Sequence, residues 1–177
     1  MIMSLESILK QVLPQPVRER IRSLQRHYRL ERSKVKSKIT GELVTKTQII
    51  RDLERMGVQS GDSVIVHSSL SRLGLVDGRA ATVVEAIRQL LGTDGTVVVP
   101  TIQLRVSARE HFASDPAFHV CITPSVMGAI SESVRTLPDA YRSMHPTHSV
   151  AAVGKHAQYL TQDHHKSELP FGPYSPR

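Results

Sequence analysis

The feature that most constrains this chain is a strand–helix–strand pattern between residues 63 and 100. Ser63–Val66 has the composition of a buried strand, and "TVVVP" at 96–100 predicts a second strand that ends at Pro100. Between them, residues 80–91 place their apolar side chains on one helical face. A nearly continuous run of valine suits a strand that is buried on both faces. The pattern therefore predicts an α/β fold with a mixed, partly parallel sheet flanked by helices.

The segments on either side extend this prediction. Thr45 and Thr47 introduce an apolar periodicity that predicts a helix ending at Gly57. Thr123 and Pro124 predict the start of another helix, with threonine as its cap, running to residue 137. Residues 149–153 predict a strand and residues 155–160 a short helix, whereas the polar stretch 105–120 predicts an irregular loop.

The positive charge is confined to the N-terminal part of the chain. Residues 1–50 hold eleven Lys/Arg and four Asp/Glu, whereas the remaining residues hold twelve of each. Residues 1–44 therefore form a predicted basic amphipathic helical arm, and residues 45–177 form the domain. The arm could bind a membrane surface, contact another subunit, or be a solvated helix with one packed face. The neutral domain gives no support for nucleic-acid binding.

A single cysteine, Cys121, rules out an internal disulfide and favours a reducing compartment, so we expect a cytoplasmic protein. Cys121 could be a catalytic thiol, but its neighbours Val120 and Ile122 favour a buried structural thiol. No apolar run approaches the length that spans a bilayer, and no signal-peptide pattern opens the sequence.

Polar residues follow both strands of the strand–helix–strand pattern. The segment from His67 to Ser71 carries three hydroxyls directly after the first strand, and Thr101 follows the second. Ligands of such sheets gather beyond the carboxyl ends of the strands, where backbone N–H groups and hydroxyls suit phosphate or amide oxygens. The simpler interpretation is that Ser68 or Ser69 caps a helix.

Three further clusters carry ionisable side chains. His145 and His148 are candidates for general-base catalysis, for a metal pair, or for structural hydrogen bonds, and no third metal ligand stands at a fixed spacing. Glu132 could be solvated or could bind a cationic substrate. The run from Asp163 to His165 is predicted to be an exposed helix end without a role.

Five segments occur in a specific order: GDSVIVHSSLSRLG, GTDGTVVVPT, TPSVMGAISESVR, RSMHPTHSVAAVG and PFGPYSP. Together they resemble the aminoglycoside 3-N-acetyltransferase family, also called the antibiotic N-acetyltransferase family, over about residues 46–176. Members of that family use acetyl-CoA to acetylate an amine of an amino-sugar ring, on an α/β fold distinct from that of the GNAT acetyltransferases.

The resemblance implies that this chain is an acetyl-CoA-dependent N-acetyltransferase for the 3-amino group of an aminoglycoside or a related amino sugar, without a metal. The expected coenzyme contacts are His67, Ser68, Ser69, Leu70, Ser71, Thr101 and Ser149, with Glu132 as the expected substrate contact. Antibiotic resistance is the associated biological role.

One part of the family pattern is missing from this sequence. The family carries a Thr-x-x-His-x-x-Glu motif after the segment that ends in Ser175-Pro176, and here only Arg177 follows. Thr161 and His164 repeat part of the motif but precede that segment, so no role is transferred to them. We therefore expect a domain truncated at its C-terminus that acetylates poorly by itself. The alternative is a non-catalytic remnant that binds coenzyme A or docks on a partner.

Overall fold

The computed structural model describes residue 14 and residues 43–114, 117–167 and 172–176. The predicted basic arm, residues 1–44, therefore lies almost entirely outside the described residues. Among those that are described, no helix is long and apolar enough to cross a membrane.

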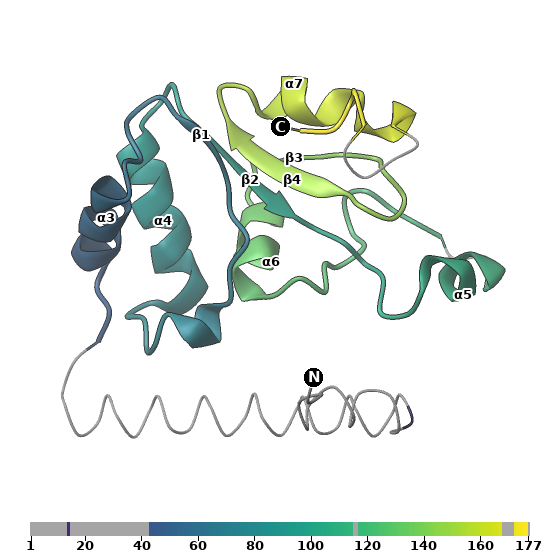
Figure 1. The fold of residues 1–177 in the computed structure, drawn as a ribbon, viewed down its shortest axis with the longest axis horizontal. Coiled ribbons are helices and arrows are strands. Elements are labelled where there is room, and N and C mark those ends of the chain that lie inside the picture. Colours follow the sequence, from purple (N-terminus) through teal and green to yellow (C-terminus); the bar gives the residue numbers. More distant parts are fainter. Residues whose placement is uncertain (1–13, 15–42, 115–116, 168–171, 177) are drawn as a thin grey trace, which may run out of the picture.

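A four-stranded sheet forms the centre of the described fold (Figure 1). The strands are β1 (Ser63–Ile65), β2 (Thr96–Pro100), β3 (Tyr141–Arg142) and β4 (Val150–Gly154), in the spatial order β1-β2-β4-β3. The β1–β2 pair is parallel, and β4 runs antiparallel to both β2 and β3. The sheet is therefore mixed and partly parallel.

Helices cover the two faces of the sheet unequally. On one face lie α4 (Arg79–Leu91) and α6 (Ala129–Arg135), with α3 (Lys46–Arg55) packed against α4. The other face carries α7 (Ala157–Gln162), as Figure 1 shows. Two short 3₁₀ helices, Leu70–Arg72 and His164–Lys166, and the helix α5 (Ala108–Ala113) complete the list of elements.

The alternation of side chains along β2 explains the two layers of core. Val97 and Val99 pack with the apolar residues of α4 and α6, whereas Val98 points to the opposite face and packs with Ala157 of α7. All five residues of β2 are buried, as the valine run predicted.

The prediction of a buried strand was wrong for β1. Ser63 and Ile65 are exposed, the latter to 46%, and only Val64 between them is partly buried. The reason is position: β1 is an edge strand of the described sheet, and α7 packs over β4, β3 and β2 instead. Ile65 pairs with Val98 and lies on the same face of the sheet. On that face, α7 packs against Val98 and the strands beyond it, on the side away from β1.

Two predictions about helices also need correction. The helix expected from Thr123 begins only at Ala129, because the Ser125 hydroxyl accepts the Met127 N–H and the Ser125 N–H donates to Glu132. These local bonds compete with helical ones. The loop expected over residues 105–120 contains α5, whose N-terminus is closed by a capping box.

Candidate functional site

At one end of the sheet, where β1, β2 and β3 finish and β4 begins, each of the four strands is next to a polar residue. His67 and Thr101 follow the ends of β1 and β2, and Ser149 precedes β4. Ser143, which follows β3, lies beside the start of β4, because its N–H donates to the Val150 carbonyl at 2.9 Å. The strand ends therefore gather at one edge, where the sequence predicted a ligand site.

Thr101 and Ser149 contact each other directly. Their hydroxyl oxygens are 3.2 Å apart, and the Ser149 hydroxyl donates to the Thr101 carbonyl at 2.9 Å. Both side chains are buried. The structure thus brings together two of the predicted coenzyme contacts, but it places them beneath the surface.

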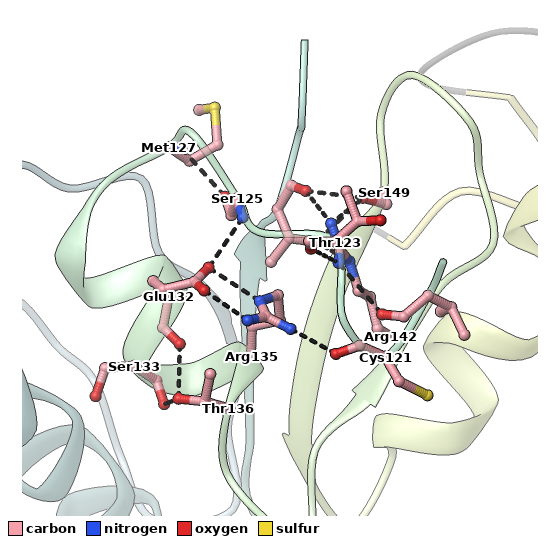
Figure 2. Close-up of polar contacts among 12 residues, drawn as sticks. Cys121, Thr123, Ser125, Met127, Glu132, Ser133, Arg135, Thr136, Arg142 and Ser149 are labelled. Atoms are coloured by element: carbon pink, nitrogen blue, oxygen red, sulfur yellow. Dashed lines mark hydrogen bonds and ion pairs between the residues drawn. The ribbon is translucent and has the colours of Figure 1, made fainter. Parts of the chain in front are cut away.

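The guanidinium of Arg142 lies against this pair (Figure 2). Its Nε donates to the Thr101 hydroxyl at 3.2 Å, and its Nη2 donates to the Thr101 carbonyl at 2.7 Å and to the Ser149 hydroxyl at 3.4 Å. Its Nη1 donates to the carbonyls of Val120 (3.2 Å) and Thr123. The five N–H groups of this arginine thus have five acceptors. Burial, and then the charge of Arg135, lower the pKa of Arg142 to about 10, so it stays cationic at neutral pH.

These contacts form a closed network. Since the Ser149 proton goes to the Thr101 carbonyl, the proton between the two hydroxyls comes from Thr101. Neither hydroxyl then has a proton left for a ligand. The network holds the ends of β2 and β4 in place and offers no donor to a bound molecule.

The segment from His67 to Ser71 is open by contrast. His67, Ser68 and Ser69 are exposed, and Leu70 and Ser71 are partly buried. Ser69 occupies the N-cap position of the 3₁₀ helix without a capping bond, and its hydroxyl lies 3.1 Å from that of Ser71. Helix capping by Ser69 therefore does not account for these hydroxyls. Within the described residues, no hydrogen bond joins this segment to Thr101 or Ser149.

A group of histidines lies next to the closed network. The ring of His145 is 4.6 Å from that of His164 and 5.6 Å from that of His148, centroid to centroid. His145 is buried and its Nδ1 accepts the backbone N–H groups of Thr147 and His148. The two predicted candidates, His145 and His148, therefore lie side by side.

The prediction of an exposed helix end at 163–165 was wrong for His164. This residue is 1% exposed, and its Nδ1 lies 2.9 Å from the Ser143 hydroxyl, which itself accepts the Val150 N–H. Burial, with smaller contributions from the charges of His145 and His148, lowers the pKa of His164 to about 4. Burial also lowers the pKa of His145. The sequence offered no signal for the burial of His164. Its neighbour His165 has almost the same residues on either side and is nevertheless exposed.

Glu132 and Arg135 form an ion pair of 2.5 Å on α6 (Figure 2). The carboxylate also accepts the Ser125 N–H, and these two contacts lower the pKa of Glu132, which is ionised at neutral pH. Arg135 donates as well to the Cys121 carbonyl at 2.7 Å. Cys121 is exposed, contrary to the prediction, because it lies in a turn beside an open pocket of about 640 Å³ rather than in the core.

Metal binding has no geometric support in the part of the chain that is described. There, His, Cys, Asp and Glu form no group of three or more that could hold a metal ion. The Nδ1 atoms of His145, His148 and His164 lie within hydrogen-bond distance of hydroxyls or backbone N–H groups.

The chain is similar to known proteins over most of its length. It is 34% identical over 148 residues to an aminoglycoside N(3′)-acetyltransferase-like protein, YokD, of Bacillus subtilis (75% of this chain and 54% of that protein). It is 36% identical over 152 residues to aminoglycoside N(3)-acetyltransferase VIII of Streptomyces fradiae (77% and 52%). The chain thus spans about half the length of the relatives it matches.

Solved structures agree with these similarities. Aminoglycoside acetyltransferase AAC(3)-Xa superimposes with a TM-score of 0.70 at 30% identity (87% of this chain, 56% of that one). A binary complex of AAC-IIIb with CoASH gives 0.61 at 29% (70% and 50%), and AAC-VIa bound to sisomicin gives 0.67 at 32% (76% and 55%). The family model for aminoglycoside 3-N-acetyltransferase matches residues 65–177. The chain therefore belongs to the aminoglycoside 3-N-acetyltransferase family.

Proposed function

We propose that this protein carries the coenzyme-binding part of an acetyl-CoA-dependent N-acetyltransferase that modifies the 3-amino group of an aminoglycoside or a related amino sugar. The observation that carries the proposal is the open segment from His67 to Ser71, which holds three hydroxyls at the carboxyl end of β1. Relatives with bound CoASH and bound sisomicin support the two substrate classes.

The open and closed parts of the edge take different roles in this proposal. The hydroxyls of Ser68, Ser69 and Ser71 and the nearby backbone N–H groups contact the pantetheine and phosphates of the coenzyme. Thr101 and Ser149 act indirectly, since their protons are already donated within the closed network. Leu70 and the ring of His67 supply the remaining contact surface.

Acetyl transfer requires a base, and of the two predicted candidates, His145 and His148, the geometry leaves His148 available. It is partly exposed, and its Nδ1 lies 2.8 Å from the Thr147 hydroxyl. When Nδ1–H donates to that hydroxyl, Nε2 carries the free lone pair. The acceptor amine attacks the thioester carbonyl, the C–N bond forms as the C–S bond breaks, and Nε2 takes the amine proton while the coenzyme leaves as thiolate. His145 is unsuited to this step because its Nδ1 is occupied and its ring is buried.

Acceptor recognition requires negative charge, because aminoglycosides are polycations. Glu132 is ionised and partly exposed, so we assign it to acceptor binding. When the acceptor binds, its amines replace part of the contact between the Glu132 carboxylate and Arg135. The single cysteine of the sequence agrees with a reducing, cytoplasmic site of action, and drug resistance is the role that this reaction would serve.

The alternative function is coenzyme or partner binding without catalysis. The chain spans about half the length of the relatives it matches, and the activity of a whole family member need not reside in that half.

Calorimetric titration with acetyl-CoA tests the proposal, and a thiol-release assay then separates the two functions. We expect saturable acetyl-CoA binding, with thiol release on adding sisomicin or glucosamine if the chain is catalytic and none if it only binds. His148→Gln should abolish any release without changing acetyl-CoA affinity. Folded protein that shows no affinity for acetyl-CoA would contradict both functions.

A further inference from the structure

Arg142 connects its own strand to three other segments. It is part of β3, and it donates to the end of β2 at Thr101, to the start of β4 at Ser149, and to the loop at Val120 and Thr123. Its guanidinium carbon also lies 4.9 Å from the ring centroid of Phe118.

The end of β2 is the element that connects this arginine to the open segment. The last hydrogen bond from β1 to β2 runs from the Val66 N–H to the Val98 carbonyl at 2.8 Å, immediately before His67. Thr101, three residues beyond Val98, is held by Arg142 through both its carbonyl and its hydroxyl. A shift of Thr101 would therefore move the strand against which the open segment begins.

The charge and geometry of Arg142 fit a role in positioning rather than in ligand binding. All five N–H groups are engaged, and among the described residues no carboxylate lies within ion-pair distance of this guanidinium. A planar fork is needed to reach two hydroxyls and three carbonyls at once, whereas lysine has a compact ammonium with three donors.

We propose that Arg142 is a positioning residue of the coenzyme site, which fixes the end of β2 and thereby the open segment from His67 to Ser71. The inference rests on the proposed function, since it concerns the same site. It assigns to Arg142 no contact with coenzyme, acceptor or reacting atoms. The closed network of Arg142, Thr101 and Ser149 is then a support that must be intact for the open segment to bind.

The test compares Arg142→Lys with a matched control, Arg88→Lys, whose arginine makes an exposed 2.7 Å ion pair with Asp139 on the surface. We expect Arg142→Lys to weaken acetyl-CoA binding by about tenfold, because ordering the open segment then takes up part of the binding free energy. Arg88→Lys should bind like the original protein. Both are measured by calorimetry under conditions where the protein is folded.

A second set of variants separates positioning from direct contact. Ser149→Ala should weaken binding by a smaller factor, and the double variant should bind no more weakly than Arg142→Lys alone, because both changes break one network. If Arg142→Lys does not fold, Thr101→Val replaces it in the same comparison. Unchanged affinity in Arg142→Lys or Thr101→Val, or losses that multiply in the double variant, would overturn this inference and leave the proposed function standing. Absence of acetyl-CoA binding in the original protein would instead remove the proposed function, and this inference with it.

Discussion

The polar strand ends of the sheet fall into two parts with similar residues. In one part the hydroxyls are buried and hydrogen-bonded within the protein, and in the other they are exposed. At the ends of β2 and β4, Thr101 and Ser149 are buried and donate their protons within the protein. At the end of β1, the hydroxyls of Ser68 and Ser69 are exposed. The comparison teaches that similar hydroxyls at strand ends are accessible to a bound molecule only where the fold leaves them exposed.

The closed half also contains the histidine group. Its buried member, His164, is expected to cause the largest effect, a dependence of the free energy of unfolding on pH. The pKa of buried His164 is lowered to about 4, against about 6.5 for an unfolded chain. The unfolded state therefore binds a proton first as the pH falls. Stability should be complete above pH 6.5 and should decrease between pH 6.5 and 4 by up to ~3 kcal/mol, at ~1.4 kcal/mol per pKa unit.

Urea unfolding as a function of pH measures this effect in the original protein and in two variants. His164→Gln should be less stable at pH 7.5 but should show a weaker dependence on pH. His165→Gln, which changes the exposed neighbour, should follow the original protein. Identical pH dependence in all three proteins would show that His164 is not the responsible group.

The next largest effect is a difference in stability between variants of the central strand β2 and variants of the edge strand β1. Val99 in β2 is completely buried, and Val99→Ala should lower the free energy of unfolding by about 2 kcal/mol, because it removes buried methyl groups and leaves a cavity. Ile65 in β1 is 46% exposed, so Ile65→Ala should cost less than ~1 kcal/mol despite the larger side chain removed. Denaturant titration of both variants gives the ranking, and equal losses would mean that β1 is covered in solution.

The smallest effect concerns the open segment. Replacing Ser69 and Ser71 together by alanine should leave the free energy of unfolding within ~0.5 kcal/mol of the original value, since one hydroxyl is exposed and the other partly buried. The same change should weaken acetyl-CoA binding by about five- to tenfold through lost hydrogen bonds. Thermal unfolding and calorimetry measure the two quantities. A loss of stability without a loss of affinity would reverse the roles assigned to the two halves of the edge.

Local pattern predicted much of the fold. The valine run predicted the fully buried β2, and Gly57, which has a φ of 92°, ends α3 as expected, with the Val58 N–H returning to the Leu53 carbonyl. The exposure of β1 was missed because it depends on which strand lies at the edge and on how far α7 extends. Those are properties of the tertiary arrangement and leave no trace in a four-residue segment.

The sequence predicted where the candidate site lies in the fold, but it did not predict the hydrogen bonds within it. The positions of the strand ends predicted that His67 and Thr101 lie at one end of the sheet, and the structure confirms that arrangement. The family resemblance added Ser149, which the structure places beside Thr101. The part played by Arg142 was missed because its acceptors are mainly backbone carbonyls, which any residue provides. The burial of His164 was missed for a related reason: its partner, Ser143, is distant in sequence.

The account depends on the open segment being the place where the coenzyme binds. Hydrogen–deuterium exchange, followed with and without acetyl-CoA, measures this directly along the whole chain. We predict slower exchange on binding at residues 67–72, with little change at residues 150–154, which pair with β2 in the sheet. Binding that protects the loop around Cys121 beside the 640 Å³ pocket, and leaves residues 67–72 unchanged, would contradict the account.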